Sequence, residues 1–253
     1  MRALKTIAIA FSMFSAVPMP QFEWDRDSMR LMLVALPLVG VVVGLLALGW
    51  ASACQALGLS ASVRALGLCA LPPLVTGGIH LDGFCDTWDA LSSHREPERM
   101  RQILKDPHIG AFGVMHLALL LLATYVLWRE LPASMPIPLA LGFVLSRSLA
   151  GLSVAAFPVA PADGLARTFS DASDRRGVCW GCGALALASC AAMVALGGWG
   201  PALAATGAFA WYRLGVVRRF GGLSGDLCGW FIQTCELWML AAWFDTQSLE
   251  VLA

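Results

Sequence analysis

The sequence predicts an all-α, polytopic integral membrane protein, and three observations indicate this class. Of the 253 residues, 58% are hydrophobic, and the mean hydropathy is +0.71. Only 13% are charged, whereas a soluble domain usually carries about 25%. Apolar stretches of about 20 residues, the length that crosses a hydrocarbon core, follow one another along the chain. We therefore expect one membrane-embedded helical bundle over residues 1–253, with its polar active-site loops on one face.

The balance of charges also excludes one class of partner. The chain has 17 Lys and Arg residues against 17 Asp and Glu residues. A nucleic-acid-binding domain is typically basic overall, with a basic stripe along one face. We therefore expect no nucleic acid as a partner, and we expect the lipid bilayer to be one of its partners.

Seven transmembrane helices are expected, each bounded by charged residues, proline or glycine. They are 31–57, 62–79, 112–129, 136–157, 178–198, 200–217 and 229–247. An earlier apolar stretch, 6–17, is short for a span and has basic residues on both sides, which favours a short re-entrant or interfacial helix. A secretory signal peptide is the alternative, although Pro18 and Pro20 directly after the stretch disfavour cleavage there.

The basic residues predict the orientation. On the seven-span arrangement, thirteen of them lie on the side of the N-terminus and the 80–111, 158–177 and 218–228 loops, against two on the opposite side. This bias predicts that the first side is cytoplasmic, in a bacterial-type inner membrane. Thirteen of the 17 acidic residues lie there too. Acidic residues contribute little to topology, so their clustering requires a different explanation.

A run of aspartates after the second span is the most informative feature. Asp82, Asp86 and Asp89 have i, i+4, i+7 spacing, which places them on one face of a helix, away from an apolar stripe of Leu81, Phe84, Cys85 and Trp88. Like charges at this spacing repel one another, and a bound cation removes that penalty. Magnesium takes one or two carboxylates together with water and phosphate oxygens. We therefore expect these aspartates to bind Mg²⁺, with a solvated acidic face as the alternative. His80 is a candidate ligand or phosphate contact, or an interfacial residue.

The loop after this helix carries the complementary charge. Ser93 and Glu96 have capping-box spacing, which predicts a short helix ended by Asp106-Pro107. It would contain four cations: Arg95, Arg99, Arg101 and Lys105. Such side chains clamp phosphate groups, although anionic lipid headgroups attract them as well. Gly110, just beyond, permits a close backbone approach to a ligand or a tight entry into the next span.

Three further features lie in or beside the later spans. Arg147 is an ionisable residue inside a span, which marks a functional site by default, and Glu236 is a candidate structural partner for it. Gly225 and Asp226 belong to a glycine-rich segment that either completes the metal or phosphate site or forms a simple turn. Cys179 and Cys182 form an isolated C-x-x-C, a weak indication of a metal or redox site.

These motifs together resemble the cobalamin synthase family, the adenosylcobinamide-GDP ribazoletransferases. The pattern G-G-x-H-x-D-G-x-x-D-x-x-D spans Gly77 to Asp89, and R-E-x-x-R with I-x-K-D-x-x-I-G-x-F-G spans Arg95 to Gly113. The family's closing G-G-x-[TS]-G-D-x-x-G is similar to Gly221 to Gly229, and its early F-x-x-x-x-P-x-P to Phe14 to Pro20. Several motifs in fixed order make this resemblance specific.

The resemblance implies an Mg²⁺-dependent transfer at phosphorus in the last steps of cobalamin biosynthesis. A ribose hydroxyl of alpha-ribazole, or of its 5′-phosphate, attacks adenosylcobinamide-GDP, GMP leaves, and adenosylcobalamin or its 5′-phosphate forms. The resemblance leaves open which acceptor is used, and whether the protein self-associates or joins other enzymes that build the nucleotide loop.

Roles for individual residues follow from the same comparison. Asp82, Asp86 and Asp89 would hold the metal, Asp106 or His80 would take the hydroxyl proton, and the remaining candidates would bind substrate. Those candidates are Arg95, Arg99, Lys105, Arg147, Gly110, Gly225 and Asp226.

Two other functions compete with this interpretation. A CDP-alcohol-type phosphatidyltransferase also uses aspartates on membrane helices, but its motif continues with Ala-Arg where this chain has Asp86-Thr87. A membrane transporter should have binding residues at mid-membrane and two repeated halves, whereas here the acidic residues concentrate at one interface.

Overall fold

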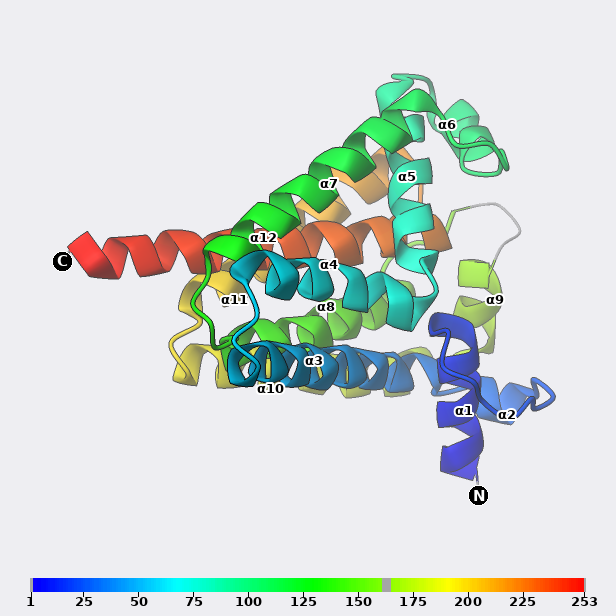
Figure 1. Ribbon diagram of the computed structural model, residues 1–253. Coiled ribbons are helices and arrows are strands. Elements are labelled where there is room, and N and C mark those ends of the chain that lie inside the picture. Colours follow the sequence, from blue (N-terminus) through cyan, green and yellow to red (C-terminus); the bar gives the residue numbers. More distant parts are fainter. Residues whose placement is uncertain (1, 161–164, 253) are drawn as a thin grey trace.

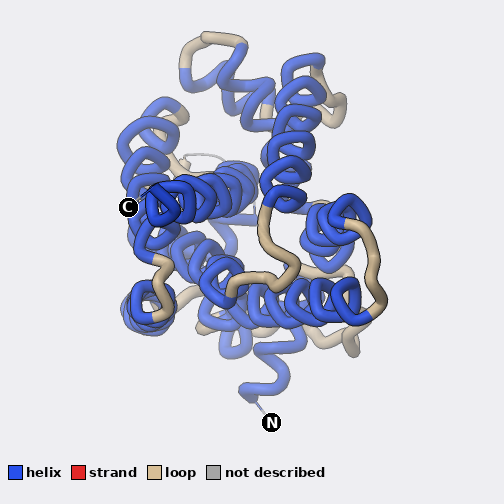
Figure 2. The backbone as a smooth tube through the Cα atoms, turned by 60° about the vertical axis from the view of Figure 1, so that its left-hand side comes forward, coloured by secondary structure: helices blue, strands red, loops and turns tan. Residues whose placement is uncertain are grey.

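The computed structural model describes residues 2–160 and 165–252, and every regular element in these ranges is helical, which confirms the all-α prediction. The helices are α1 (Arg2–Phe14), α2 (Arg26–Met29), α3 (Met32–Ala56), α4 (Ala61–Thr76), α5 (Ile79–Ser92), α6 (Pro97–Ile103), α7 (Ala111–Glu130), α8 (Ile137–Ala156), α9 (Leu165–Ala172), α10 (Arg175–Ala195), α11 (Trp199–Trp211) and α12 (Gly225–Leu252). A π-helical segment, η1 (Tyr212–Val217), continues α11. Figures 1 and 2 show these helices and the loops that connect them.

Four of the described helices, α3, α7, α8 and α10, are long and apolar enough to cross a membrane, and the pair α4 and α5 would make a fifth span if counted as one. Their positions agree with the predicted spans 31–57, 112–129, 136–157 and 178–198. The other predicted spans coincide with α4, with α11 and η1, and with α12. The total of seven transmembrane helices therefore stays a prediction. The long apolar helices support the expected membrane-type helical bundle.

The second predicted span ends earlier than expected, because the chain turns sharply after Thr76. Gly77 and Gly78 have φ angles of 66° and 81°, in the left-handed region that favours glycine. The axes of α4 and α5 consequently differ by 94°. In Figure 1, α5 runs across the end of the bundle rather than along it. This bend turns the aspartate helix away from the direction of α4.

The polar segments gather at one end of the bundle. The Ala16 N–H donates to the Val75 carbonyl, which joins the end of α1 to the end of α4 at 2.8 Å. Val159 and Leu223, from two separate loops, form an isolated bridge. Arg101 of α6 donates to the Phe220 carbonyl at 2.6 Å. The loops that the charge pattern assigned to one side are therefore joined to one another by contacts at that end.

Helix α1 lies across the end of α3 and not alongside it (Figure 1). Its 13 residues are too few to span a bilayer, and its turn from Ala8 to Phe11 is buried. A re-entrant or interfacial position for this helix therefore stays a prediction.

Candidate active site

A cleft of about 780 Å³ lies beside the bend between α4 and α5. Three carboxylates line it, from Asp82 and Asp86 on α5 and from Asp106 on the loop between α6 and α7. The remaining lining residues are the bend glycines and a set of mainly apolar side chains: Gly77, Gly78, Ile79, Leu81, Cys85, Pro107, Ile109 and Leu117. The structure thus brings together candidate residues that are 20 or more positions apart in the sequence.

Asp82 and Asp86 are one helical turn apart, the first exposed and the second half-buried. Within the described residues, neither forms an ion pair with a basic side chain. Helix α12 approaches closely at Gly83, where a Cβ atom would lie 2.7 Å from the Asp226 Cα atom. The carboxylates of Asp82, Asp89, Asp106 and Asp226 all repel a charge on Asp86. The cleft is therefore a concentration of negative charge that favours a cation.

Contacts with His108 stabilise the ionised form of Asp106. Its Oδ1 atom accepts from the His108 backbone N–H at 3.0 Å and lies 2.8 Å from the His108 ring Nδ1. The backbone N–H, followed by the ring, lowers the pKa of the Asp106 carboxyl below its ordinary value, because both stabilise the charged form. Asp106 is thus a carboxylate at neutral pH.

Asp89 has a different position from the other two aspartates of its helix. Its two carboxylate oxygens accept from the backbone N–H groups of Gly110, at 2.7 Å, and Gly113, at 2.9 Å. These are unpaired donors at the start of α7, where a negative charge is stabilising. A Cβ atom at either glycine would lie under 3 Å from the Asp89 carboxylate. Asp89 therefore joins α5 to α7, and Gly110 serves this contact; neither residue lines the cleft.

The donor set decides whether the predicted metal fits. Among the described residues, no group of three His, Cys, Asp or Glu side chains could hold a metal ion. Asp82 and Asp86 nevertheless face one cleft from successive turns of one helix. Mg²⁺ usually binds through one or two carboxylates and completes its shell with water and substrate phosphates. The cleft therefore fits a two-carboxylate magnesium site that substrate completes, and not a closed site built by protein alone.

The predicted capping box is wrong. Helix α6 begins after Glu96, with Pro97 in its first turn, a position that suits proline because its missing N–H has no helical partner there. Ser93 instead ends α5, where its hydroxyl donates to the Ala90 carbonyl at 2.6 Å. Helix α6 accordingly includes two of the four predicted cations, Arg99 and Arg101.

The predicted phosphate-binding cations lie outside the cleft. Arg95, Arg99 and Lys105 are exposed, and Arg99 Nη1 donates to the Gln102 side chain at 2.6 Å. None of them is among the lining residues. Lys105 directly precedes Asp106, which places its backbone beside the cleft.

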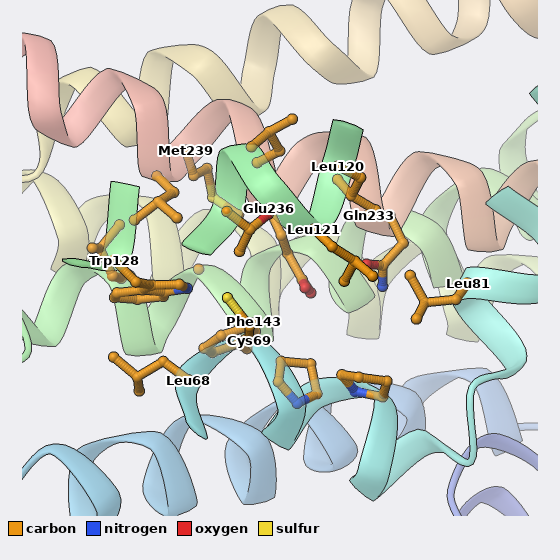
Figure 3. Close-up of a pocket in the computed structure, with 17 residues that line it drawn as sticks. Leu68, Cys69, Leu81, Leu120, Leu121, Trp128, Phe143, Gln233, Glu236 and Met239 are labelled. Carbon is orange, nitrogen blue, oxygen red and sulfur yellow. The ribbon is translucent and has the colours of Figure 1, made fainter. Parts of the chain in front are cut away.

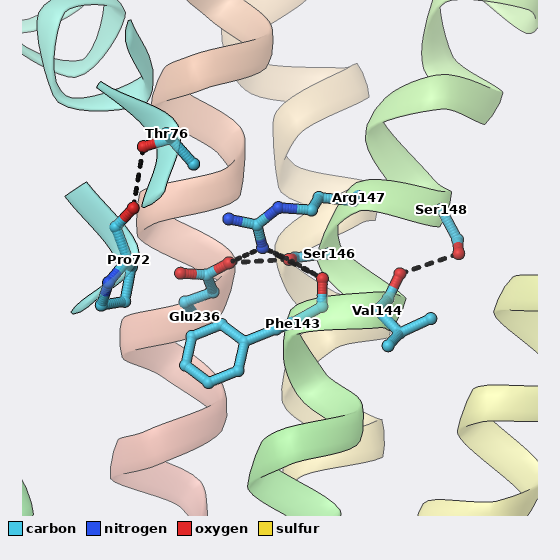
Figure 4. A network of polar contacts seen from close by, with 8 residues as sticks. All are labelled: Pro72, Thr76, Phe143, Val144, Ser146, Arg147, Ser148 and Glu236. Atoms are coloured by element: carbon cyan, nitrogen blue, oxygen red, sulfur yellow. Dashed lines mark hydrogen bonds and ion pairs between the residues drawn. The ribbon is translucent and has the colours of Figure 1, made fainter. Parts of the chain in front are cut away.

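Arg147 lies inside the bundle and not at the cleft (Figure 4). Its side chain has no exposed surface, and its Nη1 atom lies 2.6 Å from Glu236 Oε1. The same Nη1 donates to the Phe143 carbonyl at 3.0 Å, and the Ser146 hydroxyl donates to Glu236 at 2.9 Å. The predicted pairing of Arg147 with Glu236 is confirmed. The pair links α8 to α12, which leaves Arg147 no access to a substrate in the cleft.

Three other candidates, His80, Gly225 and Asp226, also lie away from the cleft lining. His80 is 6% exposed, and its Nε2 atom is buried without a hydrogen-bond partner. Gly225 is exposed and begins α12. Asp226 follows it half-buried in the first turn, behind Gly83. At the isolated C-x-x-C, the Cys182 thiol contacts the Leu33 carbonyl at 3.4 Å.

A smaller pocket of about 50 Å³ lies among α4, α7, α8 and α12 (Figure 3). Its lining is apolar apart from a few groups, and Gln233 and Glu236 extend into it from α12. Leu81 lines both this pocket and the acidic cleft. No motif predicted this pocket, because its lining residues resemble ordinary membrane-helix positions.

The fold and the cleft together define a class: a helical integral membrane protein with a carboxylate-lined site at one end of its bundle. Comparison with known proteins gives the family. The chain belongs to the cobalamin-5-phosphate synthase family, whose model matches residues 6–244.

Curated relatives agree with this assignment over nearly the whole chain. It is 36% identical to the adenosylcobinamide-GDP ribazoletransferase of Lachnoclostridium phytofermentans, over 94% of this chain and 92% of that protein. It is 35% identical to the protein of the same name from Desulfitobacterium hafniense, over 96% and 98%. A third, from Clostridium perfringens, is 28% identical over 92% and 94%. No solved structure matches the chain.

Proposed function

We propose that this protein is an adenosylcobinamide-GDP ribazoletransferase. It joins adenosylcobinamide-GDP to alpha-ribazole or its 5′-phosphate and releases GMP, in the last steps of cobalamin biosynthesis. The family and the names of the relatives support this activity. The observation that carries it is the cleft in which Asp82, Asp86 and Asp106 meet.

The first role of the cleft is to hold a divalent cation. Asp82 and Asp86 would hold Mg²⁺, because their carboxylates share the cleft and have no basic partner among the described residues. When bound, the ion would neutralise charge on the pyrophosphate during the transfer. Asp89 supports the site indirectly, because its contact with α7 fixes the start of that helix beside the 106–109 loop.

The second role is to take a proton. A ribose hydroxyl of the acceptor forms a bond to the cobinamide-linked phosphorus, the bond from that phosphorus to the GMP oxygen breaks, and the hydroxyl proton must leave. Asp106 is the candidate general base on position, because it lines the same cleft as Asp82 and Asp86. Its lowered pKa keeps the carboxylate free to accept a proton but also makes it a weak base. The exposed cations Arg95, Arg99 and Lys105 are candidates to attract the pyrophosphate from the solvent side of this end.

The distribution of charges supports a cytoplasmic orientation for the end of the bundle that carries the cleft. On the seven-span arrangement, thirteen basic residues lie on the same side as the N-terminus and the loops at the end of the bundle that carries the cleft. The positive-inside rule favours the cytoplasm for that end. The protein would then act in the inner membrane, with the cleft open to substrates made in the cytoplasm.

Incubating purified protein with adenosylcobinamide-GDP, alpha-ribazole and Mg²⁺ tests the proposal. We expect GMP and a cobalamin product to form in equal amounts, and chromatography measures both. Alpha-ribazole and its 5′-phosphate should be supplied in separate reactions, which identifies the acceptor. A CDP-alcohol and a phosphatidyl acceptor serve as the control for the rival transferase activity. Absence of GMP with both acceptors would refute the proposal.

A further inference from the structure

Arg101 makes a contact that neither the proposed metal site nor the candidate phosphate contacts explain. It lies in α6, and its Nη1 atom donates to the carbonyl of Phe220, 119 positions further along the chain, at 2.6 Å. Arg101 is partly buried, whereas Arg99 on the same helix is exposed and contacts Gln102. Among the described residues, no other side chain of α6 is hydrogen-bonded outside that helix. Arg101 is therefore the polar link between α6 and the rest of the bundle.

The Phe220 carbonyl requires a partner of this kind. Phe220 follows the last turn of the helix that α11 and η1 form, and it is fully buried. The last carbonyls of a helix have no N–H partner within the helix, and they carry the negative end of its dipole. Among the described residues, no backbone N–H outside the helices donates to this carbonyl. The guanidinium of Arg101 thus supplies both the hydrogen bond and the positive charge that this helix end favours.

The glycine-rich segment that follows is fixed on its other side as well. A Cβ atom at Gly221 would lie 3.0 Å from Arg101 Nη1, so the guanidinium packs directly beside this glycine. The Leu223 N–H donates to the Pro158 carbonyl at 2.8 Å, and the Ala160 N–H donates to the Leu223 carbonyl at 3.0 Å. Helix α12 begins two residues after Leu223. Arg101 therefore joins α6 to a segment that is itself held in place.

Helix α6 leads directly to the cleft. Asp106 follows Arg101 by five positions and lines the cleft together with two aspartates of α5. The N–H groups of residues 104, 105 and 106 donate to carbonyls of α6 at 3.0–3.1 Å, which continues the turn of the helix up to Asp106. In Figure 1, α6 lies at the outer edge of the bundle, beyond α5. A displacement of α6 would therefore move Asp106 relative to the aspartates of α5.

We propose that Arg101 is a positioning residue for the proposed reaction. By holding α6 at the end of η1, it fixes Asp106 relative to Asp82 and Asp86. Arg101 does not line the cleft, so it acts on the reaction only through the segment that carries Asp106. This inference rests on the proposed function, because it requires these three carboxylates to act on one reaction.

Hydrogen exchange tests the contact without reference to activity. Arg101→Met keeps an apolar stem and removes every donor, so the N–H groups of residues 104–106 should exchange about tenfold faster than in the wild type, as expected when a local unit opens more often. Arg219→Met is the matched control, because Arg219 is exposed, directly precedes Phe220 and has no hydrogen bond or ion pair from its side chain among the described residues. Its exchange at 104–106 should equal that of the wild type. Arg101→Lys retains a charged donor and should restore the protection.

Steady-state GMP release gives the second readout. In Arg101→Met, kcat should fall about 10–100-fold, because a small displacement of a reacting group has an effect of this size. KM for each substrate should stay within about threefold of the wild-type value, since Arg101 touches neither substrate. Arg101→Lys should recover most of the lost kcat, and Arg219→Met should lose none. If Arg101→Met does not fold, Arg101→Gln, which keeps a neutral donor on a shorter stem, is compared with Arg219→Gln in both experiments.

The outcomes separate this inference from the proposed function. Wild-type exchange and wild-type kcat in the Arg101 variant, or a kcat in Arg101→Lys as low as in Arg101→Met, would overturn the positioning role. Absence of GMP release by the wild type would instead refute the proposed function, and the exchange rates would still show whether Arg101 holds α6.

Discussion

Replacing Asp89 with alanine should destabilise the protein more than it affects metal binding. The substitution removes the acceptors of two backbone N–H groups at the start of α7, 2.7 and 2.9 Å away, together with a negative charge at that helix terminus. Loss of a helix cap usually costs about 1 kcal/mol, and loss of a favourable terminal charge about 0.3–1 kcal/mol. We therefore expect a total of about 2 kcal/mol.

Thermal unfolding in detergent measures this effect. For a chain of this size, about 2 kcal/mol corresponds to a Tm decrease of about 4–8 °C. Asp82→Ala is the matched control, because Asp82 belongs to the same helix but caps none. Its Tm should stay close to that of the wild type, since the relief of repulsion among the carboxylates offsets the loss of a negative charge in the first turn of α5, whereas its GMP release should be lost.

Asp89→Asn separates a capping role from a metal-binding role. If Asp89 caps α7, the Mg²⁺ concentration that gives half-maximal GMP release should stay within about twofold of the wild-type value. Removing a group that only orients a metal ligand typically weakens metal affinity about 10–100-fold, and removing a direct ligand should weaken it at least as much. A tenfold or larger increase in that concentration, with an unchanged Tm for Asp89→Ala, would refute the capping account and restore Asp89 as a ligand.

Three further substitutions test contacts that hold the bundle together. Gly83→Ala should lower Tm, because its Cβ atom would lie 2.7 Å from the backbone of α12 and overpacking costs about 1–3 kcal/mol; Gly183→Ala, whose Cβ atom would meet nothing within 4 Å, should not. Glu236→Ala should reduce the yield of folded protein in detergent severely, because an unpaired buried charge at Arg147 costs about 3–5 kcal/mol, and a wild-type yield would contradict this. Asp174→Asn should lower Tm at neutral pH. A backbone N–H at the start of α10 and a nearby arginine lower the pKa of the Asp174 carboxyl, so its contribution is lost as the pH falls below about 4 and the Tm difference from wild type should shrink there.

The sequence predicted the helical class and the aspartate helix because both depend on local patterns. Apolar runs of the length of a bilayer produced the helices of the bundle, and the i, i+4, i+7 spacing of the aspartates required only one regular helix. The pairing of Arg147 with Glu236 was also predictable, since two opposite charges inside apolar helices have few other ways to be stabilised.

The division of roles among the aspartates was not predictable from spacing. Asp89 lies on the same general side of α5 as Asp82 and Asp86. The start of α7 packs beside it, however, and backbone N–H groups there donate to both of its carboxylate oxygens. Asp106 joins the cleft because the loop before α7 folds back toward α5. Both facts depend on contacts between segments about 20 residues apart, which periodicity along one helix does not encode.

The bend after Thr76 was missed for a related reason. Gly77 and Gly78 are compatible with a continuous helix in sequence, since glycine is common in membrane helices, and only their left-handed φ angles reveal the turn. The capping box failed because Pro97 determines where α6 begins, a stronger constraint than the spacing of Ser93 and Glu96.

The most direct test of the central claim compares GMP release from adenosylcobinamide-GDP and alpha-ribazole by the wild type and by Asp86→Asn, both purified and shown to have similar Tm. We predict equimolar GMP and cobalamin product from the wild type in the presence of Mg²⁺, and a decrease in kcat of at least a hundredfold in the variant. Full activity of Asp86→Asn would contradict the assignment of this cleft as the active site.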